Sequence, residues 1–255
     1  MLKFIKYDIK GSLKTLLGFL FGGMIASIFV QININSKLLR AQNFNYVKDV
    51  IAAVGVLVAA ITVISFIVYA INSFNREINS DTGYLTFQTP QKMWKMVASK
   101  LIVMGVWSLI YLLVGFYINI ILTNLLQSGS FRGVLEYSNL ISNDMFYIFT
   151  TDIVMVLSLI YLSLSISKTT IKYKKLNWMW IVILVALIAA TFYLKKYIFA
   201  LRPNELLPGQ ALVIYPFYGL ELKDGDQIYY MLINLGLTII DVFATGLILD
   251  KKINL

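Results

Sequence analysis

Long runs of apolar residues, separated by short polar segments, dominate the pattern along the chain. A bilayer core about 30 Å thick is crossed by about 20 apolar residues in a helix, and six runs approach or reach that length. The pattern therefore predicts an all-α integral membrane protein with six transmembrane helices. The predicted spans are, in chain order, Leu16–Ile34, Val50–Ile71, Val97–Leu122, Met145–Ile166, Trp178–Ala200 and Ile228–Leu249.

Composition and charge agree with lipid as the main solvent. Of 255 residues, 59% are hydrophobic and 14% are charged, whereas a soluble domain has roughly 25% charged residues. The net charge of +9 comes from Lys and Arg between the apolar runs, so we expect contact with membrane lipids and no nucleic-acid partner. More of these cations fall on the side of the N-terminus, including the cluster Lys172–Lys175. Both termini are therefore predicted to be cytoplasmic.

The N-terminal residues 1–15 combine apolar side chains at helical spacing with lysines on an adjoining face. This pattern predicts a basic amphipathic helix at the inner membrane surface. The alternative is a basic flank that only fixes the orientation of the first span.

Gly18, Gly22 and Ala26 recur every four residues in the first span. A stripe of small residues lets a second helix approach closely in lipid. We expect a packing face here, for a neighbour within the chain or for a second copy. The alternative is chance, because small residues are common in membrane helices.

The segment 72–99, between the second and third spans, carries an unusual pattern for a short polar connection. A turn that ends at Gly83 precedes a short apolar run from Tyr84 to Phe87. Pro90 follows and suits the first turn of a helix that leads into the third span. Aromatic side chains on such a segment either contact a partner or fold back onto the membrane interface.

The last outer segment, 201–227, contains an apolar and aromatic run at Ala211–Leu220 that is too short to span. It predicts a re-entrant hairpin before the last helix. The alternative is an ordinary loop of apolar composition.

Several kinds of chemistry are excluded by residue type. The chain has no cysteine and no histidine, which removes disulfides, thiol nucleophiles and the commonest transition-metal ligands. It also has no phosphate-binding loop of the form G-x-x-x-x-G-K-[ST]. We therefore expect no catalytic, cofactor-binding or metal-binding residues, and no enzyme activity of its own.

Asp152 and Asp241 fall inside predicted spans. An ionisable group in lipid is costly and predicts a function, here a proton or cation site or a polar link between helices. The alternative is that Asp152 reaches the headgroups and that Asp241 bonds a neighbouring Thr or Asn. The two acids lie at different depths, which argues against a single paired site.

The whole arrangement resembles the membrane subunit of ABC-2-type exporters. The specific match lies after the second span, where Arg76-Glu77, Gly83, a short apolar run, Thr89-Pro90 and a basic helix reaching Lys100-Leu101 follow in the order of that family. The architectural resemblance covers the whole chain, whereas the motif covers this segment alone.

The resemblance implies one transmembrane domain over 1–255, with 1–15 as a connecting helix, 72–99 as the coupling loop and 201–227 as the extracellular re-entrant segment. It also implies residues that contact a separate ATPase, namely Gly83, Tyr84, Leu85, Thr86, Phe87, Gln88 and Pro90. The implied outer gate comprises Tyr215, Pro216, Phe217 and Tyr218.

The implied partners are two copies of an ATPase subunit, which would bind ATP and Mg, and a second copy of this permease or a homologous permease. The spans favour hydrophobic or amphipathic cargo, and the Lys-, Ile- and Asn-rich composition is typical of Gram-positive bacteria. Compact permeases of this kind export toxins, phenol-soluble modulins or antimicrobial peptides. We expect a multi-pass permease of the bacterial cytoplasmic membrane that exports peptides. The alternatives are a secondary transporter or channel using Asp152 and Asp241, and an assembly subunit that transports nothing.

Overall fold

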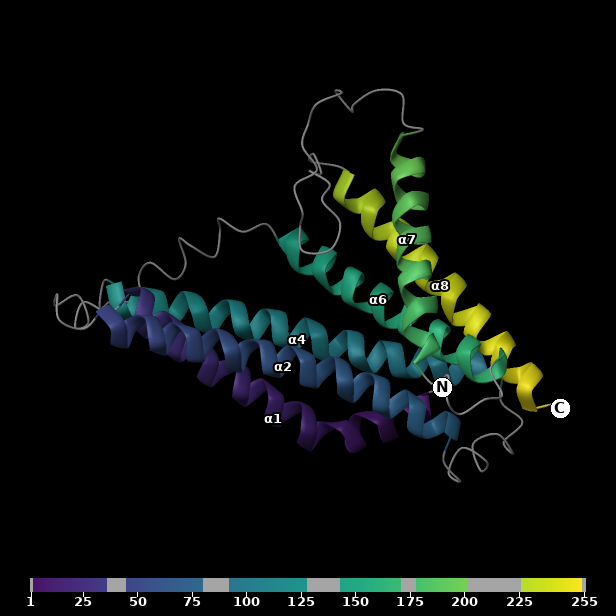
Figure 1. Ribbon diagram of the computed structural model, residues 1–255, viewed down its shortest axis with the longest axis horizontal. Helices are drawn as coiled ribbons and strands as arrows, with labels where there is room; N and C mark the ends of the chain where they lie inside the picture. Colours follow the sequence, from purple (N-terminus) through teal and green to yellow (C-terminus); the bar gives the residue numbers. More distant parts are fainter. Residues whose placement is uncertain are drawn as a thin grey trace. The chain divides into compact units, whose positions relative to one another are not determined.

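The computed structural model describes residues 2–35, 45–79, 92–127, 143–170, 178–200 and 226–253. Within these ranges the chain forms six α-helices and no β-strand (Figure 1). The helices are α1 (Leu2–Asn35), α2 (Asn45–Asn79), α4 (Met93–Gln127), α6 (Asn143–Thr170), α7 (Met179–Ala200) and α8 (Asp226–Ile253). The all-α character predicted from the sequence is confirmed for these residues.

Five of the described helices are long and apolar enough to cross a membrane. The stretches that meet this condition are Phe4–Gln31, Met93–Asn119, Tyr147–Lys168, Met179–Ile198 and Ile228–Lys251. The protein is therefore a helical, multi-pass membrane protein. The sixth predicted span, Val50–Ile71, lies within α2, and its crossing of the membrane stays a prediction.

The predicted connecting helix, 1–15, and the first predicted span lie in one uninterrupted helix, α1. The location of the first turns of α1 at the membrane surface stays a prediction. The predicted re-entrant run, Ala211–Leu220, lies outside the described residues.

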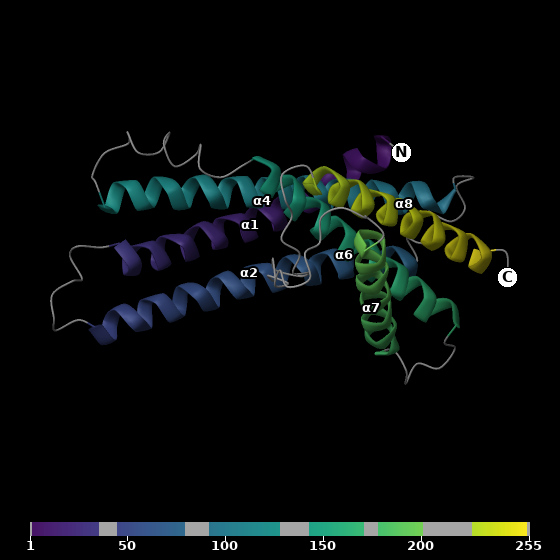
Figure 2. The same cartoon turned by 90° about the horizontal axis from the view of Figure 1, so that it is seen from above.

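The chain divides into two compact units. The first comprises Met1–Arg76 and Ile102–Thr150, in which α1, α2 and the later part of α4 run side by side (Figures 1 and 2). Helices α1 and α2 approach closely where Gly55 faces α1, since a β-carbon there would lie 2.6 Å from Val30 Cγ2 and 3.3 Å from Ala26 O. Packing of this kind is a main source of helix association in lipid.

Polar side chains tie α1 to α4 in the same unit. The Gln31 amide donates to Asn119 Oδ1 at 2.9 Å, and the Asn119 amide donates to Ser27 Oγ at 3.4 Å. The Tyr111 hydroxyl donates to the carbonyl oxygen of Leu16. Tyr111 also contacts α2, since its ring lies 5.4 Å from the ring of Phe66.

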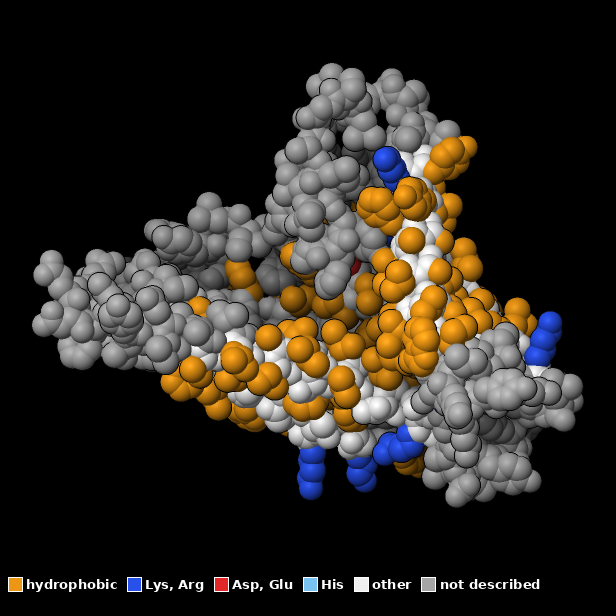
Figure 3. Space-filling view, in the orientation of Figure 1, with side chains coloured by type: hydrophobic (Ala, Val, Ile, Leu, Met, Phe, Trp, Pro, Cys, Tyr) orange, Lys and Arg blue, Asp and Glu red, His pale blue; other side chains and the backbone are white. Residues whose placement is uncertain are grey.

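The second unit comprises Glu77–Leu101 and Thr151–Leu255. Its apolar centre is formed by Met155 and Leu159 of α6, against which partly buried side chains of α7 and α8 pack, namely Leu184, Leu187, Ile188, Phe192 and Leu237. Large apolar side chains also cover much of the described outer surface on the face drawn in Figure 3. That arrangement is expected when lipid surrounds the helices.

We predict that Gly55→Val destabilises the protein, because the added β-carbon and methyl groups would meet Val30 and the α1 backbone. Overpacking of this kind costs about 1–3 kcal/mol. Thermal unfolding in detergent measures the effect. The matched control is Gly18→Val, where a β-carbon meets no atom within 4 Å. Equal stability of the two variants would show that α1 and α2 do not touch at Gly55.

Candidate functional site

Helices α7 and α8 turn polar side chains inward, which reverses the pattern of a soluble protein. On α8 the buried polar residues are Tyr230, Asn234, Thr238, Asp241 and Thr245. Their spacing of three or four residues places them on one face of the helix. On α7, the buried side chains among the described residues are Thr191 and Lys195. Such inward polar faces join helices in lipid, where apolar side chains gain little by leaving the surface.

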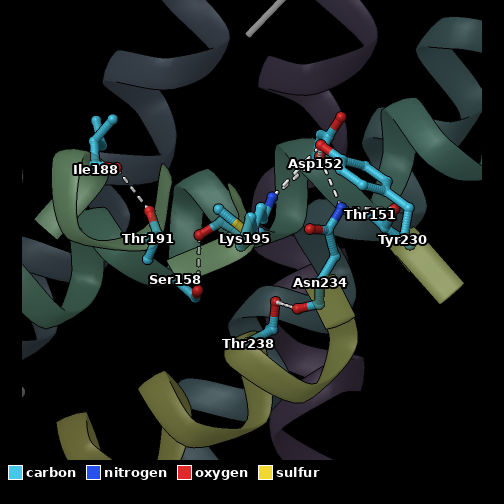
Figure 4. A network of polar contacts seen from close by, with 10 residues as sticks. Thr151, Asp152, Ser158, Ile188, Thr191, Lys195, Tyr230, Asn234 and Thr238 are labelled. Atoms are coloured by element: carbon cyan, nitrogen blue, oxygen red, sulfur yellow. Dashed lines mark hydrogen bonds and ion pairs between the residues drawn. The ribbon is translucent and has the colours of Figure 1, made fainter. Parts of the chain in front are cut away.

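Asp152 of α6 is the centre of a polar cluster built from three helices (Figure 4). The Tyr230 hydroxyl donates to Asp152 Oδ1 at 2.8 Å, and the Asn234 amide donates to the same oxygen at 2.7 Å. Lys195 Nζ lies 4.0 Å from Asp152 Oδ1. The carboxylate therefore meets two hydrogen-bond donors from α8 and one cation from α7.

Lys195 also contacts Tyr230 directly. Its Nζ lies 3.5 Å from the Tyr230 hydroxyl oxygen and 4.7 Å from the centre of the ring. The lysine can thus donate to a hydroxyl that itself donates to Asp152, and the ring face adds a cation–π attraction. Only 1% of Lys195 is exposed, so its amino group meets protein atoms and not water.

Asp152 is buried among these partners, since only 7% of the residue is exposed; contact with headgroups, the alternative from the sequence, stays a prediction. Removing one partner of a buried ion pair costs about 3–5 kcal/mol, since the other charge is left uncompensated. The Asp152–Lys195 pair therefore helps to fix the position of α7 against α6, whichever function it serves.

Asp241 belongs to a second polar layer. Ser158 Oγ lies 2.8 Å from Asp241 Oδ2 and 2.7 Å from the carbonyl oxygen of Met155. Six residues separate Asp152 from Ser158, so the layers are about 9 Å apart along α6 at 1.5 Å per residue. The two acids do not share a site, and each has partners of its own.

A third group of contacts fixes the first turn of α4 against the end of α8. The Met93 backbone N–H donates to Asp250 Oδ1 at 3.2 Å, which caps the start of α4. A β-carbon at Gly246 would lie 2.6 Å from Trp94 Cβ, and the Trp94 and Phe243 rings are 5.3 Å apart. An acid from another helix thus supplies a cap to the first turn of α4.

An ion pair between a buried lysine and a partly exposed glutamate joins the two ends of the segment that contains the predicted coupling loop. Lys100 Nζ lies 2.7 Å from Glu77 Oε1, and 3% of the Lys100 side chain is exposed. Glu77 is in the last turn of α2 and Lys100 in the second turn of α4. The segment between them is therefore held at both of its roots.

The remaining predicted positions are placed as follows. Gly22 faces α2, since a β-carbon there would lie 3.1 Å from Thr62 Cγ2, whereas Gly18 faces open space. Ala26 is buried near Gly55, so Gly22 and Ala26 meet a neighbour within the chain. The predicted ATPase-coupling residues, Gly83 to Pro90, and the predicted gate, Tyr215 to Tyr218, lie outside the described residues.

The partners of Asp152 were not predicted from the sequence. Tyr230, Asn234 and Thr238 are spaced by four residues in a span that also carries Asp241, and this spacing is a detectable sign of an inward polar face. A lysine within the apolar run of α7 was a second sign. Within the described helices, no group of three or more acidic side chains lies close enough to hold a metal ion.

No protein-family model, curated protein or solved structure matches this chain.

We predict that Lys195→Met and Asp152→Asn each destabilise the protein by about 3–5 kcal/mol, because each leaves a buried charge without its partner. The double variant should lose less than the sum of the two, since it removes both charges. Unfolding free energies in detergent test this coupling by a double-mutant cycle. Lys196→Met is the matched control, because Lys196 is exposed. Additive losses would show that the two charges do not interact.

Proposed function

We propose that this protein is the membrane-spanning subunit of an ATP-driven exporter of the ABC-2 type, energised by a separate ATPase that binds the segment between α2 and α4. The observation that carries the proposal is the bracing of that segment at both roots. Glu77 and Lys100 join its two ends, and Asp250 and Gly246 of α8 hold the start of α4.

Bracing of this kind is what force transmission requires. A partner can shift a conformational equilibrium only through contacts that differ between the two states. If the two ends of the segment between α2 and α4 were free, a displacement of the segment would not reach the helices. Because both ends are held by side-chain contacts, a displacement moves the helices to which they are bonded. Here the displaced parts would be α8 and the start of α4, up to Leu101, which belong to the same compact unit as α7 and most of α6.

The proposed cargo is a hydrophobic or amphipathic peptide, exported across a bacterial cytoplasmic membrane by two permease copies. The described helices are rich in apolar side chains, and two of their buried cations, Lys100 and Lys195, lie beside carboxylates of the protein. Such walls suit an apolar cargo better than a small hydrophilic ion, which would need a polar path.

We expect Phe87→Asp and Tyr84→Asp to abolish peptide transport while ATP hydrolysis by the co-purified ATPase continues. The aromatic side chains would transmit the ATPase motion, and a carboxylate would weaken an apolar contact. Transport into inside-out vesicles over a peptide panel, measured beside phosphate release, tests this expectation. Phe87→Leu is the matched control, since it keeps an apolar side chain.

Transport unchanged in both aspartate variants would contradict the coupling role. Transport by the purified chain without any ATPase would favour the alternative, a gradient-driven transporter that uses Asp152 and Asp241.

We further expect Glu77→Lys and Lys100→Glu each to reduce ATP-dependent transport by more than about tenfold, the equivalent of about 1.4 kcal/mol. Each variant places like charges where the native pair lies 2.7 Å apart. The double variant, with the charges exchanged, should recover transport. Lys251→Glu is the control reversal, because Lys251 is exposed at the end of α8. Failure of the exchange to restore transport would exclude a coupling role for the pair.

A further inference from the structure

The two acids of α6 and α8 differ in how their charge is balanced. Asp152 has two hydrogen-bond donors and a cation nearby. Asp241 forms no salt bridge with any described residue, and its hydrogen-bonding contact there is Ser158. Yet Asp241 is buried, with only 8% of the residue exposed, and it lies in a helix apolar enough to span a membrane. An ionised carboxylate in such surroundings is expensive unless a cation or a proton neutralises it.

The Ser158 hydroxyl has one proton and two oxygen neighbours to which it could donate it. Ser158 Oγ lies 2.7 Å from the Met155 carbonyl oxygen and 2.8 Å from Asp241 Oδ2. A hydroxyl carries one proton, and a carbonyl oxygen can only accept. If Ser158 donates to Met155, the contact with Asp241 is a hydrogen bond only when Asp241 supplies the proton.

We propose that Asp241 is a proton-binding site, which carries its proton on Oδ2 and donates it to Ser158 Oγ. The proton then lies between Asp241 Oδ2 and Ser158 Oγ, and the Ser158 hydroxyl donates its own hydrogen to the Met155 carbonyl oxygen. All three oxygens are then satisfied and no net charge is buried. Asp152, by contrast, has a cation beside it, with Lys195 Nζ 4.0 Å from its Oδ1.

Two further polar atoms lie on the same face of α8. Asn234 Oδ1 and Thr245 Oγ1 have no hydrogen-bond partner among the described residues, and both residues are fully buried. Thr245 is one turn beyond Asp241 and Asn234 two turns before it. They extend the hydrogen-bonding face on both sides of the acid, which is where a proton that arrives or leaves needs partners.

The proton has a direct spectroscopic readout in the purified full-length protein. Infrared spectra should contain the C=O stretch of a protonated carboxylic acid near neutral pH. The band should disappear in Asp241→Asn and persist in Asp152→Asn and in Asp8→Asn, an acid outside this cluster. In Ser158→Ala the band should persist at a shifted frequency, because the acid loses its acceptor.

Proton release on unfolding gives a second measurement that does not require a variant to be fully stable. An aspartic acid in an unfolded chain ionises with a pKa of about 4, so unfolding near pH 7 should free one proton that the folded protein held at Asp241. The wild type and Asp8→Asn should therefore release one proton more per chain than Asp241→Asn.

Absence of the acid band in the wild type, its persistence in Asp241→Asn, or equal proton release by the wild type and Asp241→Asn would overturn the proton site. Neither measurement needs an ATPase or a cargo. A failure of the exporter proposal would therefore leave the proton site standing, and the reverse also holds.

Discussion

Polar groups that face lipid have no water to bond, so they must find partners inside the protein. This constraint organises the second compact unit. Asp152 and Lys195 would each be costly alone, and together with Tyr230 and Asn234 they join α6, α7 and α8 at one level. Burial of large apolar side chains, which orders a soluble core, contributes less here because lipid accepts them equally well.

The first unit meets the same constraint in a different way. Its helices approach through small residues, with Gly55 of α2 against Val30 and Ala26 of α1. Hydrogen bonds from Gln31 and Asn119 then fix the pairing of α1 and α4. In the first unit, close packing attracts the helices to one another and hydrogen bonds set their register. In the second unit, charged and polar side chains do both.

Within the second unit, the two acids are suited to different tasks. A fully matched pair, such as Asp152 with Lys195, holds one arrangement, because any separation exposes two charges. An acid neutralised by a proton, as proposed for Asp241, can lose that proton, which places a negative charge in buried surroundings and makes the packed arrangement less favourable. The bracing of α4 by Asp250 and Glu77 lies on the same set of helices. Motion at the segment between α2 and α4 would therefore reach the polar face of α8 through short, direct contacts.

The sequence by itself determined that the chain is a helical membrane protein, because the length and hydropathy of each segment are local properties that decide whether it partitions into lipid as a helix. It also identified Asp152 and Asp241 as unusual, and Gly22 and Ala26 as small. Only the tertiary structure decided that Lys195 neutralises Asp152, that Ser158 meets Asp241 and that Asp250 caps α4. Those pairs are separated by tens of residues or more along the chain. Helix rotation and level within the bundle bring them together, and neither is encoded in a single segment.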